Sequence, residues 1–120
     1  MREQLLLSVL SDLNSTSTDI SASAVISTDG LPIATLLPNH LNADRVGAMS
    51  ATLLALGNRA VQELACGELD QVMVKGKSGY ILLSQAGRNA VLALLAKEGG
   101  KLGLILLDAK RAAKHIADIV

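Results

Sequence analysis

Aromatic residues are almost absent from this chain. Tyr80 is the single one among 120 residues, and there is no phenylalanine or tryptophan. Proteins that bind single-stranded nucleic acids use aromatic side chains as platforms on which bases stack. The 11 basic and 11 acidic residues also balance to a formal charge of zero, so no overall positive field attracts nucleic acid. We therefore predict that nucleic acid is not a partner.

Cysteine is equally scarce. Cys66 is the only one, which excludes a disulfide within the chain, and we expect it to be a small buried residue at a helix end. His40 and His115 lie far from it and from each other in the sequence, so no spacing typical of a metal site is present. We predict no metal and no cofactor.

Long apolar runs are missing too. No uninterrupted run approaches the length of a membrane-spanning helix, and the first residues contain no small-residue cleavage site of a signal peptide. These absences predict a cytoplasmic protein without stable membrane insertion.

Half of the residues are nevertheless hydrophobic, and the length is that of one domain, residues 1–120. Apolar periodicity and turn residues predict eight elements. Asp29-Gly30 indicates a two-residue hairpin turn, and Pro32 places its strand at a sheet edge. The expected order is helix 2–14, strands 20–28 and 31–37, helix 42–66, strands 69–75, 80–85 and 90–96, and helix 102–120.

Antiparallel hairpins dominate this order, which predicts an α+β fold. The strands at 80–85 and 90–96 are apolar on both faces, so both faces should be covered. We expect a three-layer α/β/α sandwich. Its five-stranded, mainly antiparallel sheet would have the middle helix on one side and the terminal helices on the other.

The middle helix is apolar around most of its circumference. Asn42 is a candidate N-cap, and Gly67 a candidate left-handed cap at the other end. An ordinary surface helix has a single apolar stripe, so this helix should contact its own sheet and a second body. The alternative is a helix enclosed within one domain. One face holds Val46, Met49, Leu53, Leu56, Ala60 and Leu64, and a neighbouring face holds Gly47, Ser50, Leu54, Gly57 and Val61.

No pattern in the chain predicts catalysis. Gly76-Lys77-Ser78 resembles part of a phosphate-binding loop, but Gln71 stands where the first glycine is needed and a strand follows instead of a helix. The sequence favours a hairpin turn there, and we predict that the protein is not an enzyme. The basic residues Lys110, Arg111 and Lys114 are expected on a solvated helix face, with an acidic partner or anionic membrane as the alternative.

Three sequence segments together resemble the roadblock/light-chain-7 domain family, in its prokaryotic branch. They are the hairpin at residues 25–34, the small-residue helix at 48–64 that leads to a strand at 71–74, and the loop-to-helix segment at 100–105. In the last segment, Lys101 stands at a position where the family often has an asparagine. The resemblance covers nearly the entire chain and implies a profilin/roadblock-like fold.

The resemblance also implies a homodimer in which the middle helices pack together and the third strands pair. The implied dimer residues are Gly47, Ser50, Leu54, Gly57, Val61, Gln71, Met73 and Lys75. It further implies binding to a small Ras-like GTPase and modulation of its nucleotide state. The implied partner-binding rim of the helix is Asp44, Ala48, Ala51, Ala55, Arg59 and Gln62.

Two mechanisms and two other functions remain open at this stage. Regulation could be conformational or use an arginine finger, for which Arg45, Arg59 and Arg88 are the candidates, each more simply a surface residue. The alternative functions are a dimeric scaffold without nucleotide sensing and a small-ligand sensor. The sensor would need an apolar cavity with convergent polar groups.

Overall fold

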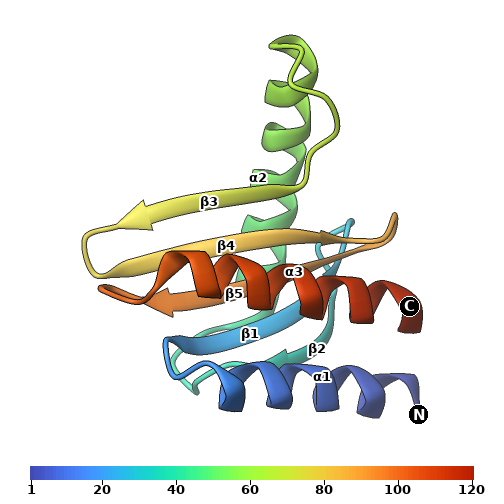
Figure 1. Ribbon diagram of the computed structural model, residues 1–120. Coiled ribbons are helices and arrows are strands. Elements are labelled where there is room, and N and C mark those ends of the chain that lie inside the picture. Colours follow the sequence, from blue (N-terminus) through green and yellow to red (C-terminus); the bar gives the residue numbers. More distant parts are fainter.

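The element order follows the apolar periodicity of the sequence. The computed structural model describes residues 1–120 and has three helices and five strands (Figure 1). The expected order is confirmed, with ends shifted by a few residues. The elements are α1 (Arg2–Thr16), β1 (Ile20–Ser27), β2 (Pro32–Leu36), α2 (Ala43–Glu63), β3 (Gln71–Gly76), β4 (Gly79–Ala86), β5 (Ala90–Lys97) and α3 (Leu102–Ile119).

All five strands form one sheet in the order β2-β1-β5-β4-β3, and each neighbouring pair is antiparallel. The first hairpin therefore joins the later three-stranded meander through the pairing of β1 with β5. β2 and β3 are the two edges, which confirms the edge position predicted from Pro32. β5 is central and almost entirely buried, as its apolar character on both faces predicts.

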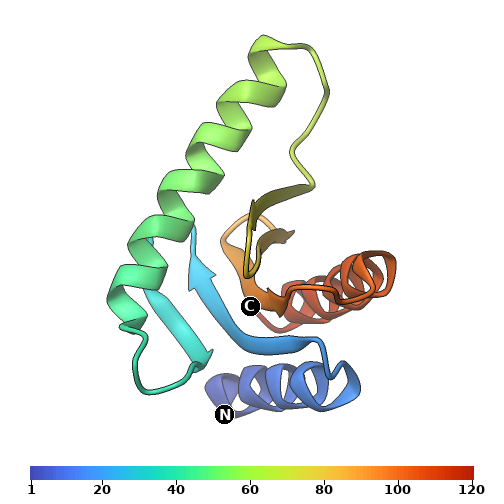
Figure 2. The ribbon, with the colours of Figure 1, turned by 90° about the vertical axis from the view of Figure 1, so that its left-hand side faces the viewer.

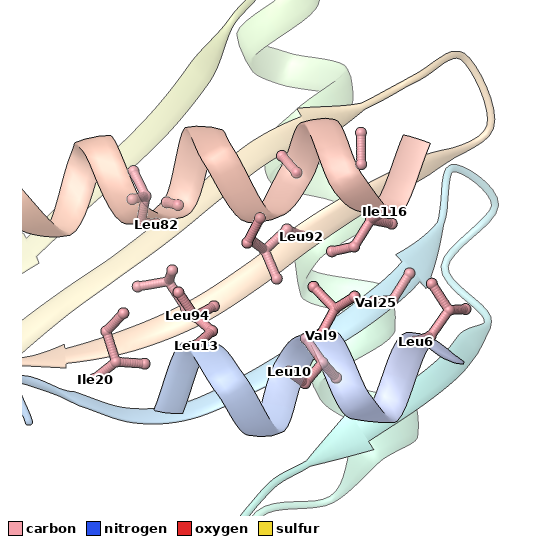
Figure 3. Close-up of a cluster of buried hydrophobic side chains, with 14 of the residues drawn as sticks. Leu6, Val9, Leu10, Leu13, Ile20, Val25, Leu82, Leu92, Leu94 and Ile116 are labelled. Carbon is pink, nitrogen blue, oxygen red and sulfur yellow. The ribbon is translucent and has the colours of Figure 1, made fainter. Parts of the chain in front are cut away.

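Three layers result. α1 and α3 cover one face of the sheet and α2 crosses the other (Figure 2). The larger core, of 18 buried residues, lies between the sheet and the helices α1 and α3, and it includes Leu6 and Leu10 of α1, Leu92 and Leu94 of β5, and Ile116 of α3 (Figure 3). The smaller core under α2 has only 6 buried residues. The side of the sheet under α2 is thus the less completely covered one.

The first hairpin differs from the two-residue turn that Asp29-Gly30 predicts. Four residues, 28–31, separate β1 from β2. The turn is held by Ser27, whose N–H donates to the Leu31 carbonyl at 2.8 Å and whose Oγ accepts the Leu31 N–H at 3.0 Å. Gly30 has a φ of +93°, which suits glycine. The wider turn carries Gly30 toward α2.

The two ends of α2 compare differently with their predictions. Asn42 caps the first turn as expected, because its side-chain oxygen accepts the Arg45 N–H at 3.1 Å. The helix ends at Glu63, before Gly67, and Ala65 takes the left-handed position with a φ of 54°. The Cys66 N–H then donates to the Val61 carbonyl at 2.8 Å, which is a Schellman closure. The predicted cap at Gly67 is therefore wrong in position.

Candidate functional site

α2 presents three different surfaces, and only one of them is covered. Its buried residues are Gly47, Ser50 and Leu54, which share one side of the helix. Leu54 is 4% exposed and belongs to the small core with residues of β1, β4 and β5. Apolar residues surround most of this helix, but the rest of the chain buries only a narrow stripe of it.

Gly47, Ser50 and Gly57 of α2 lie toward other parts of their own chain. A Cβ at Gly47 would overlap the carbonyl oxygen of Gly30, and a Cβ at Gly57 would lie 2.8 Å from Val72 Cγ2. The close approach that these glycines allow is therefore made by the first hairpin and the start of β3. Of the helix residues that the resemblance implies for the dimer, Gly47, Ser50 and Leu54 are buried within the chain, and Gly57 and Val61 are half-buried.

A second side of α2 is apolar and open, and we call it the apolar flank. Met49 is 58% exposed, Leu56 63% and Leu64, just after the helix, 74%. Apolar side chains this open are unusual when they lie together on one face. The apolar flank consists of Val46, Met49, Leu53, Leu56, Ala60 and Leu64.

The apolar flank continues onto the sheet. α2 runs across one end of the sheet, from the β1–β2 turn at Gly30 to the start of β3 at Val72. The other end stays open, and Val74 and Ile81 are 39% and 37% exposed there. A cavity of about 220 Å³ lies between the flank and this sheet end. Its walls are Ala22, Leu37, Leu41, Val46, Met49, Ser50, Leu53, Ile81, Ala93, Leu94 and Leu95.

The sequence reasoning missed this part of the site. Val74, Ile81 and Leu95 read as ordinary strand residues, because alternation shows which residues share a sheet face but not how far a helix covers that face. The oblique path of α2 is set by its contacts with Gly30 and Val72, which are distant in the sequence.

β3 forms the edge of the sheet nearest to the end of α2. Its register with β4 is regular over all six residues. Of the implied dimer residues on this strand, Met73 is 46% exposed, Lys75 is exposed and Gln71 is half-buried. Gln71 Nε2 has no hydrogen-bond partner. The last turns of α2 project beyond β3 (Figures 1 and 2).

The third side of α2 carries the predicted partner rim. Asp44, Ala48, Ala55, Arg59 and Gln62 are exposed, and Ala51 is half-buried beside the first hairpin. Arg59 Nε donates to Glu63 Oε1 at 2.9 Å, one turn along the helix. The rim and the apolar flank therefore lie on opposite sides of the buried stripe.

The remaining candidate residues of the sequence lie apart from one another. No group of three or more His, Cys, Asp or Glu side chains is arranged to hold a metal ion. None of the three helices combines the length and apolarity needed to cross a bilayer.

Cys66 is exposed, so its predicted burial is wrong: the early end of α2 leaves it in the connecting loop. Arg45, Arg59 and Arg88 are all exposed, and Arg59 is ion-paired.

Most of the chain matches a known domain family. The model of the Roadblock/LC7 domain family matches residues 6–96. The uncharacterized protein MJ1340 of Methanocaldococcus jannaschii is 39% identical over 108 residues, which are 90% of this chain and 93% of that protein. The uncharacterized protein MJ0714 of the same organism is 36% identical over 116 residues, 97% of each chain.

Solved structures agree in fold. The gliding protein MglB from Thermus thermophilus superposes with a TM-score of 0.89 at 20% identity, covering 98% of this chain and 90% of that one. A Roadblock/LC7 domain from Streptomyces avermitilis gives 0.84 at 24% identity, covering 93% and 94%. Profilin II of Acanthamoeba castellanii gives 0.66 at 15% identity, covering 94% and 97%. The predicted profilin/roadblock-like α+β fold is confirmed.

Proposed function

This chain belongs to the Roadblock/LC7 domain family, and from that premise we propose that it is a non-enzymatic homodimer that binds a small Ras-like GTPase and modulates its nucleotide state. One observation carries the dimer: an open strand edge, an apolar flank and an open sheet end lie next to one another. The family resemblance supports the GTPase as partner.

The two edges of the sheet differ in how they are protected against pairing. β2 is five residues long, contains Pro32 and has a register shift opposite Val25 and Ile26. Short length, proline and bulges are features that keep an edge from pairing with another chain. β3 has none of them: it is six residues long, lacks proline and keeps a regular register. We expect β3 to be the edge that pairs with a second copy.

Pairing at β3 would also cover the apolar surfaces of α2 and of the sheet. Its last turns extend past β3, so in a two-fold dimer paired at that edge they would lie over the sheet of the second copy (Figure 2). The open sheet end of that copy presents Val74 and Ile81, and the apolar flank presents Leu56 and Leu64. Burial of these surfaces against each other would stabilise the dimer through the hydrophobic effect. The surface of α2 that we propose for the dimer interface is therefore the apolar flank.

The partner rim remains free in this arrangement. We propose that Ala48, Ala55, Arg59 and their neighbours on the rim contact the GTPase. Small alanine side chains allow close approach of another backbone. Regulation would be conformational: the dimer would bind the switch region better in one nucleotide state and shift its population. An arginine finger is the alternative mechanism, and the candidate on the rim is Arg59, which forms an exposed ion pair with Glu63 on the same helix.

The alternative functions make different demands. A scaffold without nucleotide sensing would use the same dimer and bind both nucleotide states equally. A small-ligand sensor would use the cavity beside the apolar flank, but its volume of about 220 Å³ is below the usual range and Ser50 is its only polar lining residue. We expect a second copy of the chain, and not a small ligand, at this place.

The test is binding to a small Ras-like GTPase of the same organism, loaded in turn with GDP and with a non-hydrolysable GTP analogue. Ala55→Glu, on the rim, should weaken binding about tenfold or more, because it places a charged side chain in the contact. Leu104→Ser is the matched surface control, since Leu104 is 54% exposed on α3, far from the rim. Equal binding to both nucleotide states would favour the scaffold, and no binding would refute GTPase regulation.

A further inference from the structure

The basic residues of α3 border a groove on the face of the molecule opposite α2. The groove has a volume of about 360 Å³ and lies between α3, the residue before β3 and the end of β4. We call it the cationic groove. Its lining residues are Asp70, Ser84, Gln85, Gly87, Leu107, Lys110, Arg111, Ala113, Lys114 and Ala117.

The charges around α3 are unevenly distributed. The cationic groove has three basic residues, Lys110, Arg111 and Lys114, and a single acidic one, Asp70. The groove on the other side of α3, toward α1, is instead mixed. There, Arg111, Lys114 and His115 face Asp12, Asp108 and Asp118. Arg111 and Lys114 line both grooves, whereas Asp12, Asp108 and Asp118 line only the groove toward α1. On the β3 side, Lys110, Arg111 and Lys114 therefore lie around a single carboxylate, that of Asp70.

The one acidic group does little to neutralise these basic residues. Lys110 Nζ and Asp70 Oδ2 are 3.9 Å apart, and their side chains are 70% and 69% exposed. An exposed ion pair at this distance is weak and is screened by salt. A carboxylate from another molecule can therefore compete for Lys110. Lys114 lies one helical turn further on, so two acidic groups of one ligand can be bound along the helix.

The groove also has an apolar component. Leu107 is 51% exposed at its border, and Ala113 and Ala117 are small residues of its lining. An apolar residue of a ligand could pack on Leu107 while acidic neighbours contact the lysines. A membrane surface fits less well, because the apolar residues of α3 are mostly buried in the core and only Leu104 and Leu107 protrude far.

We propose that the cationic groove binds an acidic segment of a partner protein that carries at least one apolar anchor residue. The groove lies within a single chain, so this proposal does not depend on dimer formation or on the GTPase. A homodimer would hold two such segments, one on each copy. The protein would then join a second partner to whatever its α2 surfaces bind.

The experiment measures binding of a fluorescent peptide with glutamates and leucines at helical spacing to the full chain. The double variant K110E/K114E should bind at least about tenfold more weakly, because attraction becomes repulsion at two positions. Its control, K97E/K101E, changes the net charge equally, at two exposed positions before α3. Raised salt should also weaken binding to the wild type.

A second pair of variants tests the apolar anchor. Leu107→Ser should weaken peptide binding about threefold or more through lost apolar contact. Leu104→Ser is the control, since Leu104 is equally exposed one turn earlier and does not line the groove. Controls within twofold of the wild type would support the proposal. The proposal would be overturned if the peptide does not bind, or if variants and controls lose binding equally. It would also be overturned if the protein binds vesicles of anionic lipid but not the peptide. The variant Leu56→Glu, on the apolar flank, is expected to be a folded monomer, so peptide binding by this variant separates this outcome from that of the dimer.

Discussion

Replacing Leu56 with glutamate is expected to convert the dimer into a folded monomer. Leu56 lies on the apolar flank of α2 and is 63% exposed in the single chain. Full burial of a leucine side chain contributes about 1.5–3 kcal/mol. Covering the part that is still exposed would therefore contribute about 1–2 kcal/mol for each copy.

Two-fold symmetry doubles this effect. The interface contains two Leu56 side chains, one from each copy, so loss of both contacts costs about 2–4 kcal/mol of association free energy. Glutamate adds the cost of placing a carboxylate against apolar groups. A total of about 4 kcal/mol or more corresponds to a dissociation constant raised about a thousandfold. The fold itself should be unaffected, because Leu56 is not part of either buried core.

The assay is sedimentation equilibrium over a range of concentrations, with circular dichroism to confirm that the variant is folded. Ala55→Glu is the matched control: Ala55 is the preceding residue, is also exposed, and lies on the partner rim instead of the apolar flank. It should remain a dimer. If Leu56→Glu remains a dimer, or if only the control becomes a monomer, our assignment of the apolar flank and the partner rim is refuted.

Other substitutions test the packing and the caps of α2. Gly47→Ala should destabilise the fold by about 1–3 kcal/mol, because its Cβ would overlap the backbone carbonyl of Gly30, which cannot simply rotate away. Gly103→Ala, in α3 with no atom near the added Cβ, should stabilise the protein by up to about 1 kcal/mol; urea unfolding compares the two, and a loss of stability from both would contradict the steric argument. Ala65→Gly should stabilise by about 1 kcal/mol, because Ala65 has a φ of 54° at the end of α2, and an unchanged thermal midpoint would count against strain there. Leu54→Glu should unfold the chain instead of yielding a monomer, since Leu54 is 4% exposed, and a native circular dichroism spectrum would argue against its burial.

Several parts of the fold follow from local sequence alone. Apolar periodicity determined the order and type of the eight elements, because each strand or helix needs one face for the core. Pro32 indicated an edge, since proline cannot donate a ladder hydrogen bond. Asn42 indicated the start of α2, since its side chain can accept an orphan amide there. These signals act over a few residues and need no knowledge of the rest of the chain.

The orientation of α2 depended instead on tertiary packing. Apolar residues surround most of this helix, so periodicity cannot distinguish the side that meets the sheet from the side that is left open. The contact of Gly47 with Gly30, and of Gly57 with Val72, decides it by steric fit. The predicted end of the helix at Cys66 is wrong for a different, local reason. Ala65 takes a backbone conformation that its residue type disfavours.

Composition and apolar periodicity together determined a small aliphatic α+β domain with one helix too apolar for a solvated surface. Tertiary structure alone decided which flank of that helix stays open and that Asp70 lies beside Lys110. The physical reason is that these features come from contacts between segments far apart in the sequence. Such contacts depend on the shape of both surfaces, and a local pattern describes only one of them.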